Sequence, residues 1–341
     1  PPPPPPPLFF FHPQEAKRAA QESRGLGDVY KRQDPIDDGE KLEPIEDASM
    51  LDITGGWSDV LLEKIKGSNI SDDCLVVLLQ RTDPPSQSKS DSWLKAGWAC
   101  RALQSLRIGE ERFEVICYWK PAGGVGPVVL EECESTMDEA RRLDGYLWGR
   151  ILSLNQTTGR GRRGSKWRSL EGGLACTWVI PFSESEMLSP GLLQTSIGAA
   201  LSMALGCNSK WPNDLIDQHG KKLGGVLVES STSESAVRVG VGINREATVV
   251  EGTEVSGWLE HSSEMELMEV FALVDATLAS LFESHSNASQ VTESDLIEIS
   301  WRGLANSLSR GIIIWPEDGS FRVVGLDRDG SLELESRGEV R

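Results

Sequence analysis

Residues 157–168 read TTGRGRRGSKWR and place five cations and no acid in a chain whose formal net charge is −18. The cations are Arg160, Arg162, Arg163, Lys166 and Arg168. Three interleaved glycines permit backbone conformations that bring amide groups close to a ligand, and the arginines offer planar donor forks for phosphate or carboxylate. Such a loop could bind nucleic acid, hold a small phosphorylated ligand or form a solvated turn. Because expected strands flank it on both sides, we predict a fixed shape, which favours a pocket.

A second segment contains residues that could take part in catalysis or ligand binding. It is SKWPNDLIDQHGKKLGGVLVE, residues 209–229. Lys210, Asn213 and Asp214 crowd around a proline at an expected turn. Lys222 comes two residues before a glycine pair. Because glycine has no side chain, the backbone there leaves room for a lysine ammonium to approach an anion. Asp214 could hold Mg²⁺ or cap the turn.

Regular elements must position these segments. Apolar patterns predict strands from Val128 and at 150–154, 172–182, 224–230 and 236–244. In the last of them, valines and an isoleucine share one face, while Gly240 and Gly242 leave room on the other. Thr136 and Glu139 fit a capping box at the start of a helix. Two longer helices are predicted from their apolar faces, which are Leu193, Ile197, Ala200, Leu201 and Leu205, and Leu267, Phe271, Val274, Leu278 and Leu281. Residues 311–336 read as a three-stranded meander with PEDG and DRDG turns.

Taken together, STMDEA, QTTGRGRRGSKW, KWPND, KKLGGVLVE and GVGIN resemble the catalytic domain of the biotin protein ligase family, over roughly Val128 to Arg341. The resemblance implies an α+β fold: a mixed, largely antiparallel sheet with helices, like that of class II aminoacyl-tRNA synthetases, plus a small SH3-like C-terminal β domain. It implies a ligase that forms biotinyl-5′-AMP from biotin and MgATP. The biotin then passes to a lysine of a biotin carboxyl carrier protein domain of a biotin-dependent carboxylase.

The resemblance also implies roles for individual residues, with biotin, ATP and Mg²⁺ as the ligands. The expected biotin site is Ser135, Thr136, Met137, Gln156, Arg160, Gly161, Arg162, Lys222 and Gly224. The expected ATP site is Arg162, Trp167, Lys210, Asn213 and Asp214, with Asp214 at Mg²⁺ and Trp167 stacked on adenine. Catalysis is expected from Lys222, Arg162 and Arg160. Met137 departs from the asparagine of many members, and a linker of variable length makes Lys221 a lesser candidate for the lysine role.

Five regions are expected along the chain. Residues 1–33 resemble a foreign segment, because DVYKRQ at 28–33 matches the translation of a transposon end used in sequencing libraries. Residues 34–52 read as an acidic linker, and 53–125 as a small α/β domain or a degenerate winged helix, with a helix predicted over 92–106. Residues 126–306 form the expected catalytic domain, and 307–341 the expected SH3-like domain.

Composition narrows the classes of function. The acidic balance, with a pI near 4.7, disfavours nucleic-acid binding, and no apolar run approaches the ~20 residues of a membrane helix. Six scattered cysteines predict thiols in a reducing cytoplasm, and four histidines lack metal-ligand spacing. A monomer or a homodimer is expected. The alternatives are a lipoate or octanoate ligase of the same superfamily, whose RRxSGGG-type loop is missing, a biotin-responsive DNA-binding repressor, and an RGG-type RNA binder.

Overall fold

The computed structural model describes 57–68, 71–81, 91–109, 111–143, 148–181, 188–230, 236–261, 264–284, 291–312, 322–336 and 339–340. The chain divides into two compact units, Pro1–Gly124 with Ser284–Ser289 and Val125–Glu283 with Gln290–Arg341. The expected foreign segment at 1–33 and the acidic linker at 34–52 lie outside the described residues.

In its described residues, the first unit contains a three-stranded antiparallel sheet in the order β1-β3-β2 and the helices α4 and α5. Its elements are α4 (Trp57–Lys66), β1 (Val76–Arg81), α5 (Asp91–Lys95), β2 (Ala99–Ile108) and β3 (Glu111–Trp119). Trp93, Trp98 and Tyr118 form its aromatic core with Leu62 and Ile116. The segment RFEVICYW lies within β3.

The helix predicted over 92–106 is wrong. Helix α5 ends at Lys95, Gly97 adopts a left-handed φ of 75°, and the chain then enters β2. Apolar residues four positions apart fit one turn of a helix, but they also share one face of a strand, because four is a multiple of two. The glycine and the pairing with β3 decide between the two periods.

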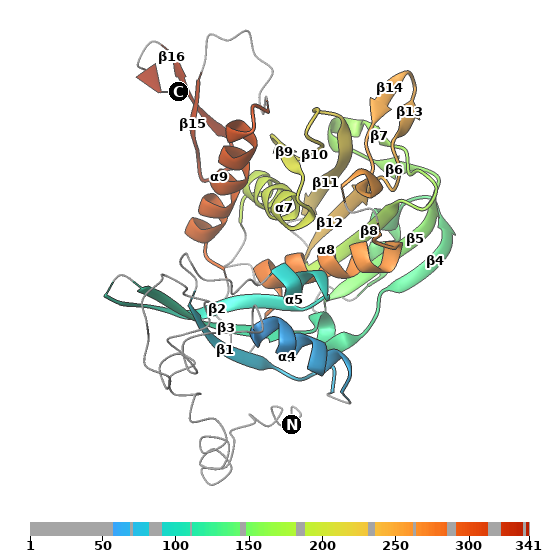
Figure 1. Cartoon of the computed structure of the whole chain (residues 1–341). Helices are drawn as coiled ribbons and strands as arrows, with labels where there is room; N and C mark the ends of the chain where they lie inside the picture. The colour runs from blue at the N-terminus through green and yellow to red at the C-terminus, as the bar shows by residue number, and fades with distance from the viewer. Residues whose placement is uncertain are drawn as a thin grey trace. The chain divides into compact units, whose positions relative to one another are not determined.

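The second unit is built on a mixed sheet with nine strands among the described residues (Figure 1). Its main path runs β13-β14-β11-β12-β8-β5-β4, and β9 and β10 extend from β11. The pairs β4–β5 and β11–β14 are parallel and the other pairs are antiparallel. The strands are β4 (Val128–Cys133), β5 (Gly149–Gln156), β8 (Leu174–Pro181), β9 (Asn208–Lys210), β10 (Asp214–Ile216), β11 (Lys222–Ser230), β12 (Ala236–Ile243), β13 (Thr248–Val250) and β14 (Thr253–Val255).

Both long helices predicted from their apolar faces are confirmed, and a further helix follows them. The helices of this unit are α6 (Thr136–Glu139), α7 (Pro190–Leu205), α8 (Leu267–Phe282) and α9 (Glu293–Ser309). Pro190 opens α7, where its missing N–H costs nothing, and Gly206 closes it with a left-handed φ of 69°. Among the described helices, none combines the length and the apolar character that a membrane crossing requires.

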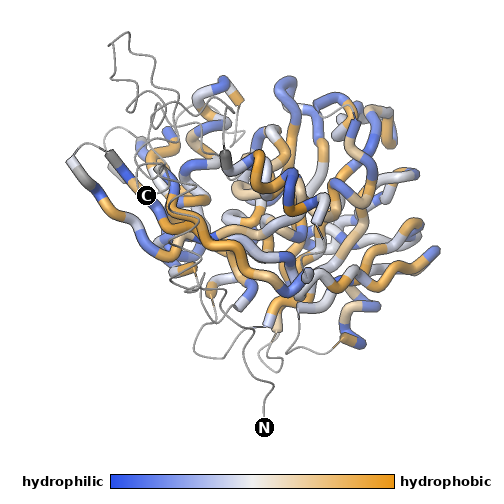
Figure 2. The backbone as a smooth tube through the Cα atoms, turned by 60° about the horizontal axis from the view of Figure 1, so that its bottom comes forward, coloured by the Kyte–Doolittle hydropathy of each residue, from blue (hydrophilic) through white to orange (hydrophobic). Residues whose placement is uncertain are grey.

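A small antiparallel sheet of β15 (Arg322–Leu326), β16 (Leu332–Ser336) and β17 (Glu339–Val340) lies near the C-terminus. The predicted DRDG turn joins β15 and β16, whereas most of the first predicted strand and the PEDG turn lie outside the described residues. The α+β class is therefore confirmed. Figure 2 shows hydrophobic residues in short stretches separated by hydrophilic ones, as expected where elements bury one face each.

A buried ion pair fastens α8 to the sheet. Arg150 of β5 lies 3.1 Å from Asp275 of α8, with the two side chains 2% and 8% exposed. The other carboxylate oxygen accepts hydrogen bonds from the indoles of Trp148 and Trp178, at 3.0 and 2.8 Å. Burial raises the pKa of the Asp275 carboxyl, while Arg150 and the two indoles oppose this. The carboxylate thus ties helix α8 to three residues in and beside the sheet.

We predict that Asp275→Asn lowers the free energy of unfolding by about 3 kcal/mol, because it leaves the Arg150 guanidinium buried without a counter-charge. Urea titration followed by circular dichroism measures the change. Glu298→Gln is the control, because the Glu298–Arg302 pair on α9 is exposed and should leave the midpoint nearly unchanged. An Asp275→Asn midpoint equal to that of the unaltered chain would contradict the tie.

Candidate functional site

One face of the second unit's sheet carries small residues where β8, β11 and β12 lie side by side. Gly242 of β12 stands opposite Gly225 of β11 and Ala175 of β8, and Gly240 stands opposite Thr177. The room that the sequence predicted at the two β12 glycines is therefore real and is widened by the neighbouring strands. Residues on the other face of the same strands point toward the helices, as Trp178 shows by stacking on Phe271 of α8 at 5.8 Å.

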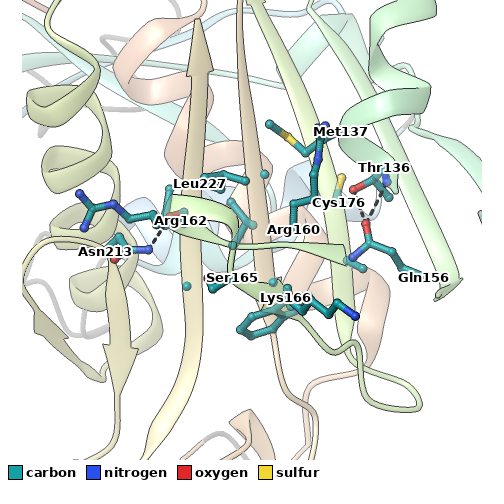
Figure 3. Close-up of a pocket in the computed structure, with 18 of the residues that line it drawn as sticks. Thr136, Met137, Gln156, Arg160, Arg162, Ser165, Lys166, Cys176, Asn213 and Leu227 are labelled. Atoms are coloured by element: carbon teal, nitrogen blue, oxygen red, sulfur yellow. Dashed lines mark hydrogen bonds between the residues drawn. The ribbon is translucent and has the colours of Figure 1, made fainter. Parts of the chain in front are cut away.

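A cavity of about 230 Å³ opens above this small-residue face (Figure 3). Its walls come from segments far apart in the sequence: α6, the end of β5, the basic loop, the turn before β10, and strands β8, β11 and β12. The lining residues are Thr136, Met137, Gln156, Arg160, Gly161, Arg162, Ser165, Lys166, Trp167, Ala175, Cys176, Asn213, Asp214, Lys222, Gly225, Val226, Leu227, Gly240, Val241 and Gly242.

The basic loop that forms one wall is itself structured. Strands β6 (Gly159–Arg160) and β7 (Lys166–Trp167) pair into a short hairpin, closed by a 3-10 turn over Arg162–Gly164. The Gly161 amide donates to the Ser165 carbonyl at 2.7 Å. A Cβ at Gly159 would lie 2.5 Å from the side-chain nitrogen of Gln156 and 2.6 Å from the backbone carbonyl oxygen of Trp167, so this close approach requires glycine. The loop has the fixed shape that its flanking strands predicted.

The cations of this site are divided between two sides. Figure 3 shows Arg160 running from the hairpin toward Met137, while Arg162 extends on the side of Asn213. Desolvation, helped by nearby Arg163, lowers the pKa of Arg162, and Asp214 opposes the shift.

Lys222 contacts two other residues of the cavity lining. Its ammonium is 2.6 Å from a carboxylate oxygen of Asp214 and 5.7 Å from the centre of the Trp167 ring. Asn213 supports the same wall, because its side-chain amide donates to the Val226 carbonyl at 2.8 Å. A cation, its counter-ion and an aromatic plate are thus assembled at one end of the cavity.

At the other end, Thr136 is held by a buried hydrogen-bond network. The side-chain oxygen of Gln156 accepts from both the Thr136 amide and hydroxyl, at 2.8 and 3.0 Å, and Thr177 donates to the Thr136 hydroxyl at 2.8 Å. The predicted capping box is therefore wrong. Ser135, not Thr136, is the N-cap residue of α6, and it makes no side-chain cap bond. The Thr136 hydroxyl is bonded to Gln156 of β5 and Thr177 of β8 instead.

Three polar atoms around the cavity are buried without a hydrogen-bond partner in the described part of the chain. They are the Ser135 hydroxyl, the Nε of Arg160 and the indole Nε1 of Trp167. Buried polar atoms are nearly always paired, so unpaired ones beside a cavity indicate groups that a ligand would satisfy.

Ten of the thirteen predicted site residues line this cavity, and three do not. Gly224 is one position out of phase on β11, so Gly225 takes its place in the floor. Lys210 lies on β9, paired with Asp214 of β10. Ser135 is 3% exposed and lies beside Thr136 without being part of the lining.

Other lining residues were not predicted as site residues. They are Ser165, Lys166, Ala175, Cys176, Gly225, Val226, Leu227, Gly240, Val241 and Gly242. The period of two along β11 and β12 is the signal for the floor, and it had already marked Gly240 and Gly242 as leaving room. Nothing in the sequence marked Cys176, whose thiol pKa is raised by burial. Among the described residues, no cluster of three His, Cys, Asp or Glu could hold a metal ion.

Part of this chain matches a known protein family. Residues 149–245, which include the basic hairpin and most of the floor, match the model of the Biotin/lipoate A/B protein ligase family. This segment of the chain is therefore similar to that family.

Curated relatives extend the match within this ligase family. The biotin–[acetyl-CoA-carboxylase] ligase of Paracoccus denitrificans is 35% identical over 34% of this chain and 53% of its own length. The bifunctional ligase/repressor BirA of Escherichia coli K12 is 30% identical over 54% of this chain and 61% of its own length. Both matches thus span less than two thirds of the relative. Among solved structures, the biotin protein ligase from Aquifex aeolicus in complex with biotin and ATP is 22% identical, with a TM-score of 0.47, over 63% of this chain and 94% of that one.

Two glycines within the family segment give a matched test of the cavity floor. A Cβ at Gly242 would lie 2.4 Å from the Trp167 ring, whereas one at Gly225, directly opposite, has no neighbour nearer than 3.5 Å. We predict that Gly242→Ala moves the indole and Gly225→Ala does not. The measurement is the Trp167 indole NMR resonance, assigned with Trp167→Phe. An unshifted resonance in Gly242→Ala would show that the ring does not rest on the floor.

Proposed function

We propose that this protein is an ATP-dependent ligase that converts biotin into biotinyl-5′-AMP and transfers the biotin to a lysine of a biotin carboxyl carrier domain. The observation that supports this best is the convergence of Arg160, Arg162 and Lys222 on one cavity in a chain of strongly negative net charge. The named relatives, which include a biotin–[acetyl-CoA-carboxylase] ligase, agree with this choice of substrate and acceptor.

The cations would offset the electrostatic repulsion between the two reacting anions in the first step. A carboxylate oxygen of biotin attacks the α-phosphorus of ATP, a new P–O bond forms, and the bond to the departing pyrophosphate breaks. Two anions must approach each other, so preorganised positive charge supplies the largest stabilisation of the transition state. Lys222 and Arg162 flank the Asp214 end of the cavity, and Arg160 lines the cavity on the side of Met137.

For the biotin ring we assign the end of the cavity near Thr136, Met137 and Gln156. The Thr136 hydroxyl and the Gln156 carbonyl already satisfy each other, with Thr177 completing the network. The adjacent Ser135 hydroxyl is buried and unpaired, so it is the donor we assign to the ureido oxygen. Met137 is 3% exposed and supplies an apolar contact at a position where many members of the biotin protein ligase family have asparagine.

For the nucleotide we assign the other end. The Trp167 ring provides a plate for adenine, and its unpaired indole N–H offers a donor. Asn213 and Asp214 line this end, with Lys210 next to them on β9. Mg²⁺ is usually held by one or two carboxylates together with substrate phosphates, so Asp214 suits MgATP without a dedicated metal cage.

The second step needs an acceptor at the cavity. The carrier lysine, as a free amine, attacks the carbonyl carbon of the mixed anhydride; the C–O bond to AMP breaks and the nitrogen loses a proton. Arg163, Lys166 and Arg168 are exposed on the hairpin beside this opening, and they would attract an acidic carrier surface. Because the reaction consumes ATP, the proposal places the protein in the cytoplasm.

We predict that the full chain, incubated with biotin, MgATP and a biotin carboxyl carrier domain, releases pyrophosphate and labels one carrier lysine. Intact-mass spectrometry of the carrier measures the labelling, and the control is a carrier whose acceptor lysine is replaced by arginine. Pyrophosphate release that follows lipoate or octanoate but ignores biotin would overturn the assignment in favour of a lipoate-type ligase.

We also predict a contrast between two adjacent lysines. Lys222→Ala should lower the rate of adenylate formation on the order of 10²-fold or more, because it removes a preorganised cation. Lys221→Ala should have nearly the unaltered rate, because Lys221 pairs with Glu254 at 2.8 Å and is not part of the cavity. Biotin-dependent exchange of labelled pyrophosphate into ATP measures both. Equal losses in the two variants would remove Lys222 from its assigned role.

A further inference from the structure

Arg160 is held by two carboxylates to which the sequence motifs assign no role. Its Nη2 donates to a carboxylate oxygen of Asp138 at 2.9 Å and lies 3.5 Å from one of Glu229. Asp138 belongs to α6, Glu229 to β11 and Arg160 to β6, so the contact joins three separate elements. An arginine on a short hairpin is thereby tied to the sheet and to the helix beside it.

A second guanidinium completes the cluster. Arg141 lies 3.5 Å from the same oxygen of Asp138 and 3.6 Å from the same oxygen of Glu229. Two cations thus share two carboxylates, and the four formal charges sum to zero. The carboxylates therefore hold Arg160 without placing a net negative charge beside a cavity that is to receive an anion.

The geometry of the guanidinium gives this contact a consequence in the cavity. The group is planar and rigid, so anchoring Nη2 also fixes the direction of its other donors. Its Nε is buried and has no partner in the described part of the chain, while the Arg160 side chain lines the cavity. One side of the fork is occupied by protein and another is left for a ligand.

We propose that Asp138 and Glu229 are positioning residues, which anchor Arg160 so that its free donor is already directed when an anionic ligand enters. The identity of that ligand, the acyl adenylate, rests on the proposed function. An unanchored arginine would have to lose rotamer freedom on binding, whereas the anchored one is ordered beforehand.

A measurement without catalysis tests the anchor itself. Phenylglyoxal modifies accessible guanidiniums, and peptide mass spectrometry gives the rate at each arginine of the ligand-free full chain. The double variant Asp138→Ala/Glu229→Ala should raise the rate at Arg160 several-fold, with exposed Arg163 as the internal reference. An unchanged rate at Arg160 overturns the proposal. The unfolding midpoint should stay close to that of the unaltered chain, because these ion pairs are partly exposed.

Kinetics then separate anchoring from charge. The alanine pair should lower kcat for adenylate formation about tenfold, because a misdirected donor is lost at the reacting centre. Asp138→Asn/Glu229→Gln keeps the accepting oxygens and should restore most of kcat. If this conservative pair falls as far as the alanine pair, charge is responsible and the positioning role is overturned.

The matched control is Glu139→Gln, on the same helix, because Glu139 pairs with Arg142 at 2.6 Å and does not contact Arg160. It should leave both the modification rate and kcat unchanged. If the unaltered protein forms no pyrophosphate with biotin and MgATP, the proposed function fails, and the phenylglyoxal rates still decide whether Asp138 and Glu229 anchor Arg160.

Discussion

The small-residue face of the sheet is the constraint on which the site depends. Where β8, β11 and β12 run side by side, glycine and alanine leave the backbone bare, so bulky groups from elsewhere can lie directly on it. The Trp167 ring rests on Gly242, and Met137 packs against Gly240, where a Cβ would come within 3.0 Å of its sulfur. These two side chains thereby form part of the cavity walls, above a floor that the strands supply.

The same strands carry large side chains on their other face, and this asymmetry makes the floor rigid. Trp178 stacks on α8, and Arg150 and Asp275 tie that helix to the sheet through a buried ion pair. A floor of glycines would by itself be a flexible surface, because glycine loses the most conformational freedom on folding. Packing on the helix side fixes its shape without using any of the space on the ligand side.

Charge in this protein is arranged around the cavity as well as in the overall composition. Lys222 is paired with Asp214, and Arg160 with Asp138 and Glu229, so two of the three cations that would receive an anion are held by carboxylates in the ligand-free state. These ion pairs hold the positively charged side chains in fixed orientations before a ligand binds. The acidic excess of the chain is thus compatible with a locally cationic site.

The sequence by itself determined the elements with a clear local period and the residues capable of chemistry. The valines and glycines of β12 and the apolar face of α7 marked their structures correctly, because burial of one face imposes a period on the sequence. The sequence-based prediction failed at 92–106, where a spacing of four residues fits a helix and a strand alike. It also failed at Thr136, a residue of helix α6 whose hydrogen bonds go to Gln156 of strand β5. Only the tertiary structure decided that Gly225 rather than Gly224 faces the cavity, whereas Lys222 was already preferred to Lys221 from the sequence and lines the cavity. A shift of one residue turns every side chain of a strand to the opposite face, and only the packing on each face fixes which one is turned inward.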